Sequence, residues 1–334
     1  MTRALVTGGS GFIGQHLVSA LVAKGNRVRI LDLHSPKLVP TTVHFVRGSV
    51  LDPTAVDVAL DEIDVVYHLA GLPGMWALRK EDFNVNCRGT EIMLAAARKR
   101  GTARFVHCST ESILFGWPRS ESVISENTKV TSAEMPGVYT RSKWEAEHLA
   151  SQAAASGFPV VIAIPTMPIG DDPNCTPPTA MLKYFLQHRV QCYLDFVLNL
   201  VDVQDVAAGL MLASMRGQPG ERYIVGGENI SMRTLLNHVG RISGRPDKHI
   251  KIPGAFAMAA ARAMDWTANH VTHRAPAATV EGVRIALRAK ALSIEKSRRE
   301  LGYAPRPIEP VLRATIMRMM NESAALRTSP AASP

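Results

Sequence analysis

The sequence contains no apolar run long enough to cross a membrane or to form a secretory signal. A membrane-spanning helix needs roughly 18 or more uncharged apolar residues, and a signal peptide needs an apolar stretch of about 7–15 residues behind a basic region; neither pattern occurs. We therefore expect a cytoplasmic protein. The most apolar segment, residues 253–271, is interrupted by Arg262 and Asp265. We expect it to form a buried helix, with peripheral contact with a membrane surface as the alternative.

Cysteine is also scarce. None of the cysteines stands in a CxxC pattern, so their spacing indicates neither a zinc site nor a disulfide framework, and we expect no bound metal. Unpaired cysteines suit the reducing cytosol. The four cysteines are Cys87, Cys108, Cys175 and Cys192.

Acidic residues are the minority, with 29 Asp and Glu against 38 Lys and Arg and a formal charge of +9. The excess lies near the C-terminus, where residues 241–320 carry 15 basic and 6 acidic residues. Such a region could face nucleic acid, acidic lipid or a phosphorylated substrate. Because the sequence has no aromatic-rich RNA-binding motif and no helix-turn-helix pattern, we expect a small-molecule substrate and no nucleic-acid partner.

Apolar strands alternate with amphipathic helices over the first two-thirds of the chain. This alternation is typical of an α/β protein with a parallel sheet. Gly25 and Gly101 fall just past predicted helix ends, where a left-handed cap is favoured. The predicted strands cover residues 3–7, 27–33, 43–48, 64–70, 104–110, 159–165 and 222–227.

The first strand and the following helix are joined by a glycine-rich turn, "TGGSGFIG" at residues 7–14. Glycines at this spacing permit a tight turn, a close approach of backbone N–H groups to a diphosphate, and close packing of helix on strand. The helix N-terminus adds unpaired N–H groups and the positive end of a dipole. The turn therefore predicts a dinucleotide site, with Gly8, Gly11, Phe12, Ile13 and Gly14 as contacts.

Asp32 ends the second predicted strand, 18 residues after Gly14. A carboxylate at this position can accept hydrogen bonds from both ribose hydroxyls and would repel a 2′-phosphate, so it favours NAD over NADP. The alternative is a surface aspartate beside a turn. Lys37 could still assist a phosphate.

These features predict a doubly wound Rossmann sheet with a smaller C-terminal substrate lobe. We expect residues 1–165, together with about 200–227, to form the dinucleotide-binding domain. Residues 166–199 and 228–322 are expected to form the substrate lobe. The tail, residues 323–334, is expected to be disordered.

Tyr139 and Lys143 stand four residues apart at the beginning of a helical pattern, "GVYTRSKWEAEHLA". Side chains at this spacing are neighbours on one helical face. A cation one turn away favours loss of the phenol proton, which in a free tyrosine occurs only near pH 10. The alternative is that Lys143 covers apolar surface with its stem while Tyr139 packs at the edge of the core.

Five motifs, "TGGSGFIG", "HLAG" (68–71), "NVNCRGT" (84–90), "HCST" (107–110) and "YTRSK" (139–143), occur in one order and spacing. Their set resembles the extended short-chain dehydrogenase/reductases, also called NAD-dependent epimerase/dehydratases, over most of the chain. The resemblance implies that Tyr139 is the general acid/base. It also implies that Lys143 lowers the pKa of Tyr139 and binds the nicotinamide ribose, and that Thr110 holds the substrate oxygen. Members are often dimers, so a homodimer is expected by analogy.

The resemblance also implies further contacts. Asn86 is expected to anchor the chain around the active site. The sequence departs from the family pattern at two places. Ser49 occupies the place of the usual adenine-binding Asp. The segment before Gly116 is one residue longer than usual, so counting back from Gly116 would place Glu111, instead of Thr110, at the position that holds the substrate oxygen. Further cofactor contacts are expected from Ser49, Val50, Leu69, Ala70, Gly71, Pro165, Thr166 and Pro168, and substrate contacts from Trp76 and Glu111.

The segment "IAIPTMPIGDDP" (162–173) lacks the Arg-x-x-Asn-x-Tyr-Gly-Pro pattern typical of sugar-nucleotide epimerases. Together with residues 198–209 and 217–236, it resembles a subgroup called hopanoid-associated sugar epimerases, which is close to dihydroflavonol reductases and 3β-hydroxysteroid dehydrogenases. We expect first an NAD-dependent epimerase of a sugar or sugar-lipid. The alternative is an NAD(P)-dependent ketoreductase or alcohol dehydrogenase for an apolar polycyclic or lipid substrate.

Overall fold

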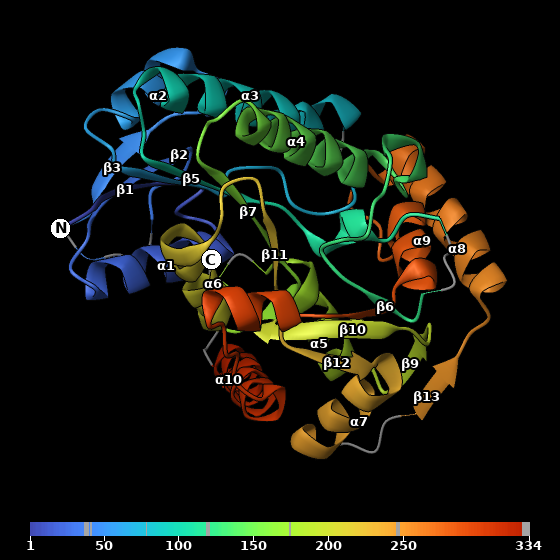
Figure 1. Cartoon of the computed structure of the whole chain (residues 1–334). Coiled ribbons are helices and arrows are strands. Elements are labelled where there is room, and N and C mark those ends of the chain that lie inside the picture. The colour runs from blue at the N-terminus through green and yellow to red at the C-terminus, as the bar shows by residue number, and fades with distance from the viewer. Residues whose placement is uncertain are drawn as a thin grey trace.

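The computed structural model has a seven-stranded parallel sheet at its centre (Figure 1). The structure describes residues 1–36, 40, 42–77, 79–117, 121–173, 175–244 and 248–328. The strand order, β11-β7-β5-β4-β1-β2-β3, runs outward from β1 in both directions, which confirms the predicted doubly wound Rossmann sheet. Every predicted strand is present within two residues of its expected bounds. The strands are β1 (Arg3–Thr7), β2 (Arg27–Asp32), β3 (His44–Arg47), β4 (Val65–His68), β5 (Arg104–Cys108), β7 (Val160–Pro165) and β11 (Arg222–Val225).

The central strands are largely apolar because helices cover both faces of the sheet. All six residues of β7 are buried. The parallel register places Thr7 of β1 beside His68 of β4, and His68 beside His107 of β5. The carboxyl ends of these strands therefore finish level with one another, at the edge where the predicted site residues follow.

Two layers of helices enclose the sheet. Figure 1 shows α2 (Pro53–Ala59), α3 (Asn84–Lys99) and α4 (Val138–Ala155) above it, and α1 (Phe12–Ala23) and α6 (Val203–Arg216) below it. Gly25 and Gly101 follow α1 and α3 with φ of 78° and 66°. The predicted left-handed caps are thus confirmed.

A second, smaller hydrophobic core lies beside the first. It packs a three-stranded sheet against helices through residues such as Leu200, Leu235 and Leu312. The strands of that sheet are β8 (Met167–Ile169), β10 (Val197–Asp202) and β12 (Glu228–Ser231), and the helices are α5 (Pro177–Gln187), α7 (Met232–Ser243) and α10 (Ile308–Thr328). Two short pairs complete the strands: β9 (Val190–Tyr193) with β13 (Lys248–Lys251), and β6 (Val123–Ile124) with β14 (Ala291–Leu292).

We propose that the two cores correspond to the two lobes expected from the sequence. Ile285, Leu292 and Leu301 of the C-terminal part pack into the first core. The lobes are therefore joined by apolar contacts.

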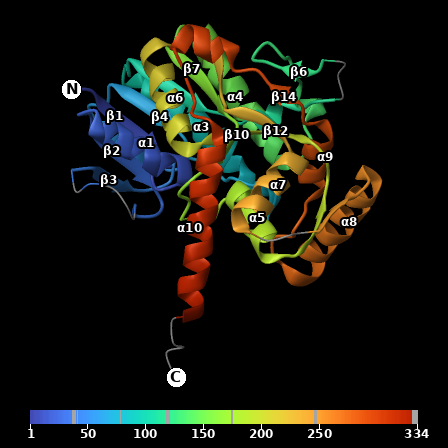
Figure 2. The ribbon, with the colours of Figure 1, turned by 90° about the horizontal axis from the view of Figure 1, so that it is seen from below.

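One expectation about the C-terminal part was wrong. The helix α8 (Gly254–Thr267) was expected to be buried, but among its residues only Ala257 and Ala261 are buried, and Phe256 and Trp266 are 72% and 60% exposed. Figure 2 shows α8 at the outer edge of the molecule. The helix α10 extends through Thr328 and projects from the body (Figure 2), and the disordered tail expected at residues 323–334 stays a prediction. Residues 329–334 lie outside the described part.

No helix in the described residues has the length and apolar character needed to span a bilayer.

Candidate active site

The glycine-rich turn has the backbone geometry expected for a diphosphate site. Gly8 has φ of 70°, and a Cβ on it would lie 2.8 Å from the backbone N of Ala70. A Cβ on Gly14 would lie 2.1 Å from the Gly8 carbonyl oxygen, so only glycine lets α1 approach β1 this closely. Gly11 is the N-cap of α1 and offers no side chain to its N–H groups, while Phe12 is buried and Ile13 packs on the core. The first turn of α1 is thus left to an external acceptor.

Asp32 lies at the end of β2 beside this turn. Its Oδ2 accepts a hydrogen bond from the backbone N–H of Ser10 at 3.0 Å, and its Oδ1 accepts one from the N–H of His34 at 3.1 Å. These bonds fix the carboxylate, and each oxygen retains a lone pair for a further donor. Lys37 lies outside the described residues.

Buried hydrogen bonds hold the chain that leaves β4. The His68 ring lies between Thr7 (2.8 Å to Nδ1) and Thr90 (3.0 Å to Nε2), and burial lowers its pKa to about 3. The imidazole is therefore neutral. The Thr7 hydroxyl also accepts from the N–H of Ala70 at 3.1 Å, and Leu69 donates its N–H to the Thr7 carbonyl.

Asn86, on α3, connects the loop after β4 to α4. Its Oδ1 accepts from the N–H of Leu72 at 2.7 Å, and its Nδ2 donates to Ser142 Oγ at 2.9 Å. A Cβ on Gly71 would lie 2.6 Å from the same Oδ1, so the loop needs glycine there. The side chain makes the kind of anchoring contacts that the sequence predicted for it.

Tyr139 and Lys143 stand on the first two turns of α4, next to the end of β5. The Thr110 side chain acts to lower the pKa of the phenol, and the phenol ring lies 5.9 Å from that of Phe83. The Lys143 ammonium donates to the Cys108 carbonyl at 2.9 Å. The structure thus brings together the three residues expected to be catalytic.

Burial is the largest influence on the pKa values of Tyr139 and Lys143. Burial raises the pKa of Tyr139 to about 12; the Thr110 side chain opposes this shift, whereas Glu281, Cys108 and Glu111 add to it. The Lys143 ammonium is directed at the Cys108 carbonyl, and the lowering of the phenol's pKa by Lys143 stays a prediction. Burial also lowers the pKa of the Lys143 amine.

Several buried polar atoms around the strand ends have no partner among the described residues. They include Oε2 of Glu111, Oγ of Ser109 and Oγ1 of Thr166. Burial raises the pKa of Glu111 to about 8, so its carboxyl group is largely protonated at neutral pH. Unpartnered buried donors and acceptors are rare in proteins, so these atoms are available to a bound molecule.

The remaining predicted residues are placed as follows. Ser49 Oγ accepts from the N–H of Leu51 at 3.1 Å, and Val50 is buried. Trp76 donates its indole N–H to Asn269 Oδ1 at 3.3 Å. Pro165 ends β7, and Pro168 lies within β8.

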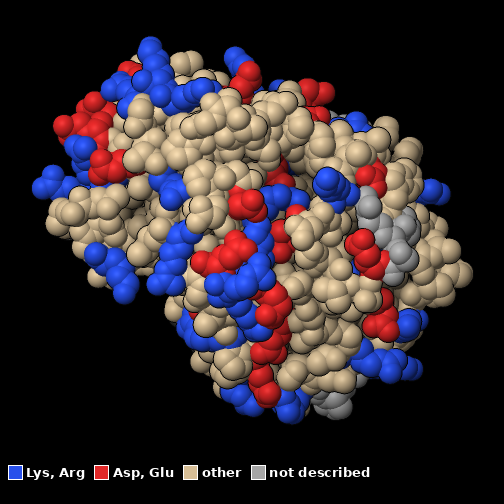
Figure 3. Space-filling view, viewed as in Figure 1, with Lys and Arg blue, Asp and Glu red and all other residues tan. Residues whose placement is uncertain are grey.

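The basic C-terminal region is extensively paired with acidic side chains. Lys251 contacts Asp195 at 2.9 Å, and Arg306 contacts Asp205 at 2.9 Å. Figure 3 accordingly shows blue and red residues side by side on this face. The excess of positive charge in the sequence is thus partly neutralised where it occurs.

Comparison with known proteins places the chain in a family. The sequence pattern of the NAD dependent epimerase/dehydratase family matches residues 4–226. The chain belongs to this family. It is 31% identical to a putative dihydroflavonol 4-reductase of Synechocystis sp., with 92% of this chain and 91% of the relative covered. It is 32% identical to a 4-hydroxy-2-methyl-3-oxo-4-farnesyl-3,4-dihydroquinoline-1-oxide ketoreductase of Stigmatella aurantiaca, with 91% and 92% covered.

The fold is also that of a solved NAD-dependent epimerase/dehydratase. The structure of UDP-glucose 4-epimerase from Thermus thermophilus in complex with NAD matches 96% of this chain and 99% of its own, with a TM-score of 0.74 and 25% identity. The resemblance to the extended short-chain dehydrogenase/reductases is therefore confirmed, and the chain is an enzyme of that family. The hopanoid-associated subgroup stays a prediction.

Sequence reasoning missed one residue of this site. Glu281, from α9 (Val280–Arg288), accepts hydrogen bonds at the beginning of α4. It lies about 140 residues from Tyr139 along the chain, and no local pattern around it indicates the contact.

Proposed function

We propose that the chain is an NAD(H)-dependent ketoreductase, or alcohol dehydrogenase in reverse, that acts on an apolar carbonyl compound. The observation that carries this proposal is the half-buried Tyr139 phenol, which stands on the first turn of α4 where the Thr110 side chain, just after β5, acts on its pKa. A proton donor in that place, beside a glycine-rich turn, suits the reduction of a ketone.

The residues present fit a dinucleotide. The turn at Gly8, Gly11 and Gly14 would hold the diphosphate on the N-terminus of α1, and the fixed Asp32 carboxylate would accept from the ribose hydroxyls. Lys143 and the unpartnered Thr166 hydroxyl stand near the place of the nicotinamide end. When bound, the nicotinamide supplies or accepts the hydride.

The chain's own residues would manage the proton. Tyr139 and Thr110 both donate to a ketone oxygen, and Tyr139 transfers its proton to that oxygen as the carbinol forms. A phenol with a pKa near 12 is fully protonated at neutral pH, so the group is ready to act as an acid. Glu111, also largely protonated, can donate to a second substrate oxygen.

The two relatives at 31% and 32% identity are named as reductases of a dihydroflavonol and of a farnesylated quinoline ketone. Both names describe ring ketones with large apolar parts, and Phe83 beside Tyr139 offers an apolar wall of the same kind. The chain also lacks the epimerase pattern after β7. We therefore favour the ketoreductase; sugar epimerisation, expected first from the sequence, stays a prediction.

Replacing the proton donor tests the reaction. With a dihydroflavonol and a 3-oxosteroid as trial ketones, we expect the wild-type protein to oxidise NADH stoichiometrically. Tyr139→Phe removes the proton donor, so kcat should fall roughly 10²–10⁴-fold while NADH affinity, followed by fluorescence titration, is unchanged. Tyr184→Phe, on the exposed Tyr184, is the matched control. An unchanged kcat in Tyr139→Phe would refute the assigned role.

Replacing Asp32 tests the cofactor assignment. Asp32→Asn removes the charge that would repel a 2′-phosphate, and like-charge contacts of this kind cost several kcal/mol. We expect kcat/KM for NADPH relative to NADH to rise by at least about tenfold, while Asp61→Asn on the exposed surface leaves the ratio unchanged. If the ratio does not move in Asp32→Asn, NAD preference does not come from this residue.

We also propose that α8 rests on an anionic lipid surface. Phe256 and Trp266 are exposed on this helix, Val271 follows it at 61% exposure, and Arg262 lies between them. Figure 3 shows few charged residues at the right-hand edge, where α8 lies in Figure 1. Aromatic side chains with an adjacent cation are typical of interfacial helices, and an apolar substrate would be met at such a surface. The expected homodimer stays a prediction.

Vesicle sedimentation tests this contact. We expect binding to phosphatidylglycerol-containing vesicles that weakens with salt, and a roughly tenfold loss in Phe256→Ala or Trp266→Ala, because each buried side chain contributes about 1.5–3 kcal/mol. Trp117→Ala, on an equally exposed tryptophan elsewhere, should bind like wild type. Equal binding of all three variants, or no binding of wild type, would contradict the proposal.

A further inference from the structure

The helix that carries Tyr139 and Lys143 has no N-terminal cap of its own. Its N-cap residue, Gly137, has no side chain to accept from the first N–H groups of α4. The acceptor comes instead from Glu281 of α9, which is 8% exposed. Its Oε1 accepts from the N–H and the hydroxyl of Thr140, both at 2.7 Å, and its Oε2 accepts from the N–H of Tyr139 at 3.2 Å.

The sequence before α4 is shaped to receive this carboxylate. A Cβ on Gly137 would lie 2.2 Å from Glu281 Oε2, so glycine at the cap is what leaves room for it. A negative charge at a helix N-terminus is favoured by the helix dipole. Glu281 therefore takes the place of a local capping side chain, from a segment distant in the sequence.

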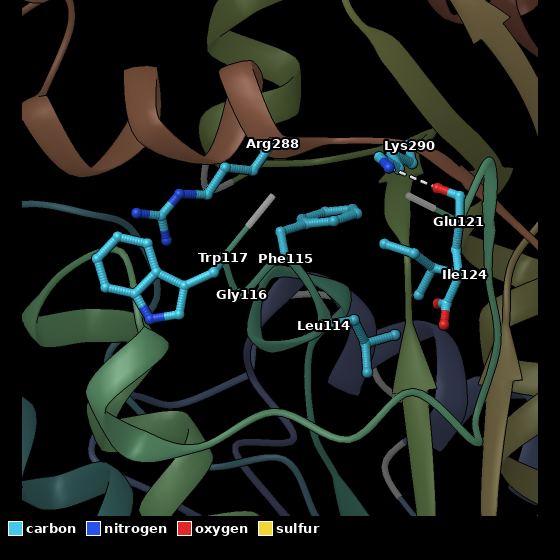
Figure 4. Close-up of a pocket in the computed structure, with 8 residues that line it drawn as sticks. All are labelled: Leu114, Phe115, Gly116, Trp117, Glu121, Ile124, Arg288 and Lys290. Carbon is cyan, nitrogen blue, oxygen red and sulfur yellow. Dashed lines mark hydrogen bonds between the residues drawn. The ribbon is translucent and has the colours of Figure 1, made fainter. Parts of the chain in front are cut away.

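Two arginines of α9 reinforce the same contact. Arg284 donates to the Pro136 carbonyl at 2.8 Å, and Arg288 donates to the Glu134 carbonyl at 2.9 Å. Figure 4 shows Arg288 beside the Trp117 ring, whose centroid lies 5.1 Å from the guanidinium carbon. The pocket between them has a volume of only about 10 Å³, which is too small for a substrate. This part of α9 thus serves to hold the chain that enters α4.

The segment around α9 also contacts the loop expected to meet substrate. A Cβ on Gly282 would lie 3.2 Å from Met75 Sδ, and Asn269 accepts from the Trp76 indole. Asp265 of α8 accepts from the N–H of Val280 at 2.9 Å, which joins α8 to α9. One segment of the C-terminal part therefore touches both the loop after β4 and the beginning of α4.

We propose that Glu281 is a positioning residue, which fixes the Tyr139 phenol by capping α4 from the C-terminal lobe. This inference rests on the proposed role of Tyr139 as the proton donor. Without Glu281 the first turn of α4 loses its acceptor, and the phenol loses its fixed place beside Thr110. Small displacements of a reacting group cost on the order of 10²-fold in rate.

The charge of Glu281 gives the proposal a second readout. The charged and titratable groups that shift the pKa of Tyr139 are Glu281 from α9, Glu111 after β5 and Cys108 of β5, and each raises it. Lys143, on α4, is directed at the Cys108 carbonyl. Removing the Glu281 charge should therefore lower the pKa of the phenol, and ketone reduction, which needs the protonated phenol, should be lost at a lower pH than in wild type.

Hydrogen exchange and kinetics together test the proposal on the full-length protein. In Glu281→Gln and Glu281→Ala we expect exchange to rise at least about tenfold in peptides covering residues 136–143, with the strands of the large sheet unchanged. With the ketone that wild type reduces, kcat should fall about tenfold in Glu281→Gln and about 10²-fold in Glu281→Ala. KM for NADH should stay the same, and the alkaline limb of the Glu281→Gln profile should move to lower pH.

Glu295→Gln, which removes an exposed carboxylate from the same lobe, is the charge-matched control and should leave all readouts at wild-type values. Arg284→Met keeps the Glu281 charge. It should raise hydrogen exchange in the peptides covering residues 136–143 without moving the alkaline limb of the pH profile of ketone reduction to lower pH. Unchanged exchange at residues 136–143 in both Glu281 variants would overturn the proposal even if no trial ketone reacts. Raised hydrogen exchange at residues 136–143 with an unchanged kcat would overturn it as well. The proposed function is tested separately, by Tyr139→Phe.

Discussion

In the proposed reaction, the Tyr139 phenol exchanges a proton with the substrate, so it has to be shielded from bulk water and held in a fixed position, and the other contacts of the site serve this requirement. Tyr139 is held from two directions: Phe83 lies beside its ring, and Glu281 caps its helix. Burial raises its pKa to about 12, and the neighbouring carboxyl groups act in the same direction. The site as a whole therefore favours the protonated phenol, which is the form that a reductase needs to donate a proton.

Much of the fold could be predicted from the sequence because its signals are local. Buried parallel strands read as short apolar runs, and the glycine turn is a fixed pattern between a strand and a helix. That Tyr139 and Lys143 lie on the same face of one helix follows from helical periodicity alone, since residues four apart share a face. Asp32 and Asn86 also lie where their motifs place them, one at the end of β2 and one on α3.

The features that escaped prediction depend on contacts between distant segments. Glu281 meets α4 across about 140 residues, and only the folded chain brings α9 to that helix. The Lys143 ammonium is directed at the Cys108 carbonyl, and burial, which the spacing of Tyr139 and Lys143 does not show, raises the pKa of the phenol. The prediction that α8 is buried was based on its apolar composition. An alanine-rich helix has the same composition whether it packs into a core or lies at the surface, so composition could not distinguish the two cases.

The central claim is that Tyr139 and Thr110 together hold the oxygen of a bound ketone. A crystal structure of the protein with NADH and a ketone that it reduces slowly tests this most directly. We expect the phenol oxygen and the Thr110 hydroxyl each to lie within about 3.2 Å of the ketone oxygen, with Glu281 still capping α4. A ketone oxygen bound away from both hydroxyls, or a phenol turned away from the substrate, would contradict the claim.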